Sequence, residues 1–197
     1  MGKLISLLKR LPSVGTHGAE RMVLWLLRES GGRSVAMDLS GALAVAVEDV
    51  GECPVCGFFN MKGGLCACCS DSGRDADSIC VVERATDVLP IERCGIYHGL
   101  YHCLGGKISP LDGIMPENLS ITSLLNRVRE RPGCEVILAV GSDVEGEATA
   151  LYLSEILAPF DCAVSRLAQG MPAGAGLGQA DAVTLMRAME GRKKMLS

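Results

Sequence analysis

The stretch Cys53-Pro54-Val55-Cys56 is followed, after nine intervening residues, by Cys66-Ala67-Cys68-Cys69. Each stretch contains a C-x2-C pair, and four thiolates that converge in this way are the ligands of a tetrahedral structural zinc site. Cys66 and Cys68 are too close in sequence to bind one ion together, so Cys68 is expected to stay outside. The sequence therefore predicts one zinc ion per chain, with free thiols in a loop as the alternative, and the predicted ligands are Cys53, Cys56, Cys66 and Cys69.

The length and the cysteine content indicate the class of protein. A chain of 197 residues can bury one real core and still carry smaller appendages. Its start, Met1-Gly2-Lys3, leads into an amphipathic segment and not into the apolar run of a signal peptide. We therefore expect a reducing, cytoplasmic location, in which the other cysteines are small core residues. No apolar stretch reaches the ~18 residues that would span a bilayer, so no membrane contact is expected.

The charge is unevenly distributed along the chain. The net charge is -4, yet residues 1–33 contain six basic and two acidic side chains, a local charge of +4 that leaves -8 for the remainder. A uniformly basic nucleic-acid-binding protein is excluded by this balance. The asymmetry is typical of a DNA-facing end joined to a body that faces a protein partner or a metal ion.

The N-terminal segment is predicted to be helical. A first amphipathic helix ends at Pro12, a second begins after Gly15 with Thr16 as its cap and stops at 30–32, and a third covers 35–50. The first two, joined by Leu11-Pro12-Ser13-Val14-Gly15, resemble a helix-hairpin-helix, in which backbone N–H groups and the second helix's N-terminus bind a DNA phosphate. An ordinary helical pair with a Pro-Gly turn remains the alternative. The candidate DNA contacts are Lys9, Arg10, Val14, Gly15, Thr16, His17 and Arg21.

Beyond the cysteines the hydrophobic period changes to alternating strands and helices. Arg74, in the polar segment that comes first, is a further candidate phosphate contact. Short apolar runs alternate with helical patterns, which indicates an α/β fold with a mostly parallel sheet and helices on its faces. The strands are expected at 79–82, 100–104, 135–140 and 162–168, and the helices at 86–94, 120–131, 148–157 and 181–190.

Four carboxylates follow strands of this predicted sheet. Parallel strands carry functional residues at their carboxyl ends, so Glu83 is expected on the same edge as Asp143, Glu145 and Glu147. Such a cluster could hold Mg2+ through oxygen ligands. The alternative is that the last three cap the following helix and stabilise it against its dipole by ~0.3–1 kcal/mol each.

Taken together and in order, these motifs resemble the RecR family of bacterial recombination mediators, from about Leu4 to Lys193. The resemblance rests on the hairpin 11–15, the four cysteines, the strand ending Val81-Val82-Glu83, the strings 99–106 and 109–113, and the segment 144–153. It implies a helical helix-hairpin-helix region (1–52), a four-cysteine zinc finger (53–76), a Toprim α/β domain (77–169) and a Gly-rich loop with a last helix (170–197).

The resemblance also implies a function. RecR-like proteins assemble as tetrameric rings that can encircle DNA, and they work with RecO and RecF to load RecA at DNA gaps coated by single-strand-binding protein, in association with the nucleoid. They are not known as enzymes, so no catalytic residue is expected. The alternatives are a Mg2+-dependent Toprim nuclease or primase-like enzyme, and a zinc-bearing adapter that does not touch DNA.

Several positions depart from the family pattern. Ser13 replaces a hairpin glycine and Thr16-His17 replaces Pro-Lys, so DNA affinity could be reduced. Gly141 stands where catalytic Toprim enzymes have the first of two aspartates, which leaves at most one loosely held Mg2+. We expect the four carboxylates to bind a protein partner, RecO by resemblance. Near the C-terminus, a loop that normally carries glutamates and a tyrosine has Gly176, Gly178 and Gln179.

Overall fold

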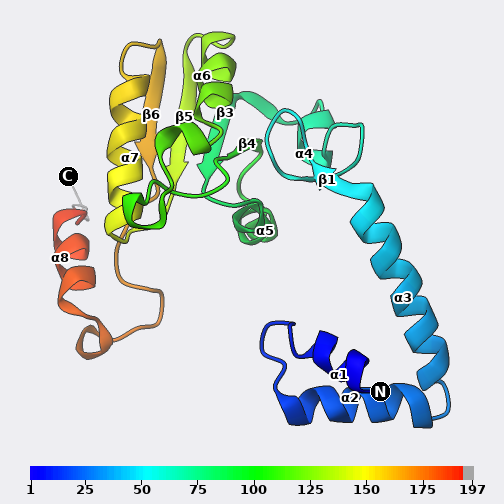
Figure 1. Ribbon diagram of the computed structural model, residues 1–197. Helices are drawn as coiled ribbons and strands as arrows, with labels where there is room; N and C mark the ends of the chain where they lie inside the picture. Colours follow the sequence, from blue (N-terminus) through cyan, green and yellow to red (C-terminus); the bar gives the residue numbers. More distant parts are fainter. Residues whose placement is uncertain (193–197) are drawn as a thin grey trace. The chain divides into compact units, whose positions relative to one another are not determined.

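The computed structural model describes residues 1–192 and divides into two units, Met1–Gly51 and Glu52–Ser197 (Figure 1). Residues 193–197 of the predicted C-terminal segment 170–197 lie outside the described part. Within that part, no helix has the length and apolar character needed to cross a membrane. The elements in order are α1 (Gly2–Leu8), α2 (Thr16–Arg28), α3 (Gly32–Asp49), β1 (Val50–Glu52), β2 (Phe59–Met61), α4 (Ala67–Ser70), β3 (Asp75–Val82), α5 (Ala85–Cys94), β4 (Gly99–Cys103), η1 (Pro110–Asp112), η2 (Pro116–Asn118), α6 (Ile121–Arg129), β5 (Cys134–Ala139), α7 (Val144–Leu157), β6 (Cys162–Arg166), η3 (Leu177–Gln179) and α8 (Ala182–Glu190).

The first unit consists of the three predicted N-terminal helices. The turn between α2 and α3 is tight: Gly31 has a φ of 90°, and a Cβ added to Gly32 would lie 2.4 Å from the Trp25 carbonyl oxygen. Glycine is therefore required at both positions. The buried residues of this unit are few, namely Ala19, Val23 and Gly32, while α3 is exposed almost along its whole length.

The hairpin between α1 and α2 corrects one sequence prediction. Gly15, in an extended conformation, is the N-cap of α2, and Thr16 is the first helical residue, so Thr16 does not cap the helix. Ser13 has a φ of 65°, which places it in the left-handed region that favours glycine. The hairpin thus keeps the backbone conformation suited to a glycine although it carries a serine.

The second unit confirms the predicted α/β fold. Its four-stranded sheet has the order β4-β3-β5-β6, with every pair of neighbours parallel. Strand β3 begins at Asp75, earlier than the apolar run predicted, because Asp75 pairs with Gly99 before a register shift at Ile79. Helix α7 likewise begins at Val144, where Asp143 caps it. The short elements β1, β2 and α4 around the cysteines were not predicted from the sequence.

Helices cover both faces of the sheet. On one face, Ile79 and Val81 of β3 and Val136 and Leu138 of β5 pack in a core that includes residues of α6 and α7. On the other face, alternate residues pack with Val88 of α5 and with the cysteine cluster. Burial on both faces explains why the central strands read as continuous apolar runs.

A buried polar network joins β4 to both ends of α6. His102 is 1% exposed, and its Nε2 lies 2.9 Å from the Ser120 carbonyl oxygen. Arg127 Nη1 donates to the Tyr101 carbonyl oxygen at 2.6 Å and lies 3.2 Å from His102 Nδ1. These contacts require a neutral imidazole with its proton on Nε2, because Nδ1 faces a donor. Burial and the nearby Arg127 lower the pKa of His102 to about 4.

Candidate functional site

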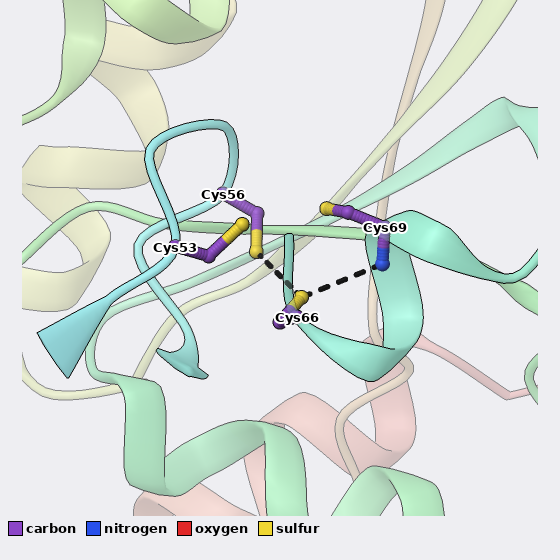
Figure 2. A group of neighbouring side chains, drawn as sticks. All are labelled: Cys53, Cys56, Cys66 and Cys69. Carbon is purple, nitrogen blue, oxygen red and sulfur yellow. Dashed lines mark hydrogen bonds between the residues drawn. The ribbon is translucent and has the colours of Figure 1, made fainter. Parts of the chain in front are cut away.

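The four predicted zinc ligands converge in space (Figure 2). Cys53 and Cys56 come from the turn after β1, and Cys66 and Cys69 flank the start of α4. The four sulfur atoms all lie within 4.8 Å of one another, with Cys56 Sγ and Cys66 Sγ 3.4 Å apart. Cys68 is also buried but does not belong to this group.

The donor set fits a zinc ion. With Zn–S bonds of about 2.3 Å, the sulfurs of a tetrahedral site lie roughly 3.8 Å apart, close to the observed spacing. One sulfur of each cysteine pair also accepts a backbone N–H: the Phe58 amide donates to Cys56 Sγ at 3.5 Å, and the Cys69 amide donates to Cys66 Sγ at 3.4 Å. Such bonds favour thiolates, which are the form that binds the metal. These four cysteines would hold the ion, whose chemistry here is structural.

The sulfurs influence one another's ionisation. The neighbouring Cys69 side chain, together with burial, raises the pKa of Cys56 well above its usual range. At Cys53 burial opposes ionisation, yet backbone hydrogen bonds from Cys66, Cys56 and Val55 lower the pKa to about 7. Four thiolates this close repel one another unless a cation lies between them, which is a further reason why the cluster suits a divalent metal.

The loop that carries Cys56 is hydrogen-bonded to the sheet. The Cys103 amide of β4 donates to the Cys56 carbonyl oxygen at 2.7 Å.

Arg74, just before β3, is paired inside the second unit. It donates to the Gly99 carbonyl oxygen at 2.9 Å and to Glu92 at 2.5 Å, and Glu92 accepts a second bond from the Tyr101 hydroxyl. The suggestion that Arg74 contacts phosphate is therefore wrong, because its guanidinium is largely buried and paired with Glu92 inside this unit.

The predicted DNA contacts gather around the hairpin of the first unit. Lys9 and Arg10 follow α1, while Val14 and Gly15 precede α2, and all except the half-buried Val14 are exposed. Thr16, His17 and Arg21 are exposed on α2, and the His17 ring lies 3.7 Å from Glu20. No described side chain caps α2, so the first N–H groups of this 13-residue helix lack a side-chain acceptor. The structure thus brings the predicted residues into one exposed region.

The predicted acidic cluster lies at the carboxyl ends of the strands, but each of its members already has a hydrogen-bond or salt-bridge partner within the chain. Glu83, which follows β3, accepts a hydrogen bond from the Gly141 amide at 2.6 Å. Asp143 caps α7 by accepting from the Gly146 amide at 2.8 Å. A Cβ added to Gly141 would lie 3.0 Å from Glu83 Oε1 and 3.5 Å from Asp143 Oδ1. The side chain missing at position 141 would therefore have entered this cluster.

Lys107 pairs with two of these carboxylates. Its Nζ contacts Asp143 Oδ2 and lies 3.1 Å from Glu145 Oε2, while the Ser109 hydroxyl donates to Glu145 Oε1 at 2.5 Å. The hydrogen bond from Lys107 lowers the pKa of Asp143, and those from Ser109 and Lys107 lower the pKa of Glu145. Both carboxyl groups are therefore held in the ionised form.

Glu147 has a different set of partners. Arg166, at the end of β6, donates to Glu147 Oε2 at 2.5 Å, and Arg187 of α8 lies 3.0 Å from Glu147 Oε1. Arg187 also donates to the Ser142 carbonyl oxygen at 2.8 Å. Glu147 therefore links the C-terminal helix α8 to the sheet.

Sequence reasoning missed the three cations Lys107, Arg166 and Arg187. Lys107 follows β4 and Arg166 ends β6, so both sit at the edge where the acidic residues were expected. Parallel strands place functional residues at their carboxyl ends, and applying this rule to basic residues as well as acidic ones identifies Lys107 and Arg166. Arg187 offers no such signal, because it comes from a helix beyond the sheet. With three cations beside four carboxylates, the cluster carries a net charge of only -1.

Comparisons with known proteins agree with this structure. Residues 77–168 match the family described as Toprim domain, and residues 170–193 match the one described as RecR, C-terminal. The recombination protein RecR of Magnetococcus marinus is 47% identical over 193 residues, which covers 98% of this chain and 94% of the relative.

Two further relatives carry the same description. RecR of Anaeromyxobacter sp. is 44% identical over 195 residues, covering 99% of this chain and 97% of the relative. RecR of Roseiflexus sp. is 46% identical over 193 residues, covering 98% and 93%. The resemblance inferred from the motifs is confirmed: the chain belongs to the RecR family of recombination proteins.

Proposed function

We propose that the chain is a non-enzymatic DNA-binding clamp of recombinational repair, which acts with RecO and RecF to promote RecA loading at gaps. The observation that carries this proposal is the similarity to recombination proteins over nearly the whole chain. The site of action is the nucleoid in the cytoplasm. The working parts are the four segments 1–52, 53–76, 77–169 and 170–197.

The hairpin is the proposed DNA contact. The uncapped N–H groups of α2 attract an anion, and the helix dipole adds to this attraction. The exposed side chains of Lys9, Arg10, His17 and Arg21 supply further donors and positive charge. Such contacts reach phosphates and not base edges, so binding is independent of sequence and weak for each chain.

Assembly of several chains makes this weak contact effective. Helix α3 exposes large apolar side chains, including Met37, Leu43 and Val47, which are 74%, 57% and 78% exposed. Apolar surface of this extent marks a protein contact, and a ring of four chains is the assembly we propose. Four hairpins on one DNA molecule then bind by avidity.

The zinc ion is proposed to be structural, one per chain, and the acidic edge is proposed to contact RecO. Asp143 is the most exposed of the paired carboxylates, with 58% of its side chain accessible, so it is the one best placed to meet a basic partner. The rival function, a Mg2+-dependent Toprim nuclease or primase-like enzyme, needs carboxylates that are free to hold metal ions. Gly141 and the pairing of Lys107 argue against it.

The proposed DNA contact is tested by removing two hairpin charges. We expect Lys9→Ala together with Arg21→Ala to weaken duplex binding about tenfold or more at moderate salt, and to reduce the slope of log K against log salt by about 2. The matched control is Lys62→Ala with Arg93→Ala, two exposed basic residues of the second unit. Unchanged affinity in the first variant would place the DNA contact elsewhere. Cleavage or priming in Mg2+, abolished by Glu83→Ala, would favour the enzyme.

A further inference from the structure

The loop after β4 is fastened to the start of α7 by several hydrogen bonds. The Ile108 amide donates to Thr149 Oγ1 at 2.9 Å, and the Thr149 hydroxyl donates to the Glu145 carbonyl oxygen at 2.7 Å. Ser109 donates to the Glu145 carboxylate, and Lys107 lies between that carboxylate and Asp143. Three consecutive loop residues, 107–109, thus contact the first two turns of one helix.

Lys107 is the only described cation within salt-bridge distance of Asp143 or Glu145. Its side chain is 22% exposed, and Ser109 and Thr149 beside it are buried. An ammonium that bridges two carboxylates compensates their mutual repulsion, which is what a bound divalent cation does at a carboxylate site. The bridge also joins two segments that are 36 residues apart in sequence.

We propose that Lys107 is a resident cation: it occupies the position between Asp143 and Glu145 that a divalent ion would otherwise take, and it positions the loop 105–109 against α7. The edge of the sheet is then held together without a divalent metal. This inference concerns the geometry of the second unit and does not rest on the proposed contact with DNA. Lys107 is a positioning residue, since it acts through the loop that it holds.

The first experiment removes the negative charges that face Lys107 and keeps the shapes of the two side chains. In the Asp143→Asn, Glu145→Gln double variant, the asparagine still caps α7, because Asn and Asp are equally good N-caps. The glutamine amide oxygen can still accept from the Ser109 hydroxyl, which also lies 2.8 Å from Asp112 Oδ2. We expect the Ile108 amide to exchange its hydrogen about tenfold faster, because the loop loses its charge-assisted bonds. The control, Glu130→Gln with Asp161→Asn, removes the same charges at exposed positions elsewhere. If the Ile108 amide exchanged its hydrogen equally fast in the double variant and in the control, the proposal would be overturned.

The second experiment removes the cation from the zinc-loaded full chain. Lys107→Met removes the charge but keeps an unbranched side chain that is one atom shorter, and Lys62→Met is the matched control. We expect Lys107→Met to bind Mn2+ at least tenfold more tightly than the unmodified protein, measured by electron paramagnetic resonance of free Mn2+. Mn2+ should also restore the slow exchange of the Ile108 amide, which a merely structural loss would not allow.

Two results would contradict the inference. One is Mn2+ binding by the unmodified protein as tight as by Lys107→Met. The other is a folded Lys107→Met variant that neither gains Mn2+ affinity nor recovers slow exchange with Mn2+. If circular dichroism shows that Lys107→Met does not fold, the isosteric double variant tests the positioning of the loop, and Lys107→Gln replaces Lys107→Met in the Mn2+ measurement.

Discussion

The two units of the chain differ in how well each covers its own apolar side chains. In the unit Met1–Gly51, three helices bury almost nothing beyond Ala19 and Val23. In the unit Glu52–Ser197, the sheet has a core on each face and a buried His102–Arg127 network. Burial of apolar surface stabilises by about 25 cal/mol per Å2, so burial contributes more to the stability of the second unit than to that of the first.

This difference separates two kinds of function. The second unit fixes the cysteine cluster and the carboxylates in definite geometry, because both are attached to a packed sheet. The first unit presents a hairpin and exposed apolar helices, and we expect these to be completed by other chains and by DNA. The chain has a single tryptophan, Trp25, in α2, while its three tyrosines lie in the second unit. Trp25 fluorescence therefore reports the first unit alone.

The largest expected effect is loss of zinc from the second unit. Cys56→Ser removes a buried ligand, and apparent zinc-binding energies of about 10–16 kcal/mol are also folding energies in modules this small. We expect the variant to lose zinc and the segment 53–70 to unfold, measured by metal analysis and by circular dichroism. Cys68→Ser is the control and should keep its zinc. Zinc retained by Cys56→Ser, or lost from Cys68→Ser, would contradict the assignment of ligands.

The buried histidine makes the stability of the second unit depend on pH. The pKa of His102 is lowered to about 4 in the folded protein, compared with about 6.5 in the unfolded chain, so the unfolded state binds more protons between these values. Stability is therefore full above pH 6.5 and decreases as the pH falls, by about 2 kcal/mol between pH 7 and pH 5. Urea unfolding at a series of pH values, followed by tyrosine fluorescence, measures this loss of stability.

The control for this pH effect is His102→Gln, whose amide can keep both hydrogen bonds but does not titrate. The difference between the two proteins isolates His102 from the carboxylates that also titrate in acid. An equal loss of stability in both proteins would show that other groups cause it.

The apolar surface of the first unit predicts that self-association depends on α3. Leu43→Ser removes an apolar side chain that is 57% exposed, and we expect the assembly to weaken about tenfold, or about 1.4 kcal/mol. Sedimentation velocity over a dilution series measures this change. Leu111→Ser is the matched control, since Leu111 is 98% exposed in the second unit. A similar effect from both variants would mean that α3 is not the contact.

The smallest effect concerns the hairpin serine. Because Ser13 has a positive φ, Ser13→Gly should stabilise the first unit by less than about 1 kcal/mol. Ser40→Gly, within α3, should change stability in the opposite direction by a similar amount. Denaturation followed by Trp25 fluorescence compares the stability of the two variants. A destabilising Ser13→Gly substitution would show that the serine side chain is needed in the hairpin.

Much of the fold was predictable because its signals are local. The alternation of apolar runs and helical patterns predicted the parallel sheet, and the paired C-x2-C spacing predicted which thiols would meet. The errors also have local causes. The sequence pattern predicts Thr16 as a cap although the extended Gly15 takes that place, and it suggests Arg74 as a phosphate contact although Glu92 pairs with it in the fold. A sequence pattern does not indicate which charges are already paired.

The family, the α/β order of elements and the identity of the four clustered cysteines follow from the amino-acid sequence. The pairing of Lys107 with Asp143, 36 residues away, and the contact of Arg187 with Ser142, 45 residues away, emerge only from the folded chain. The physical reason is the range of the interactions. Helix and strand patterns depend on residues a few positions apart, whereas an ion pair depends on which distant segments packing has brought together.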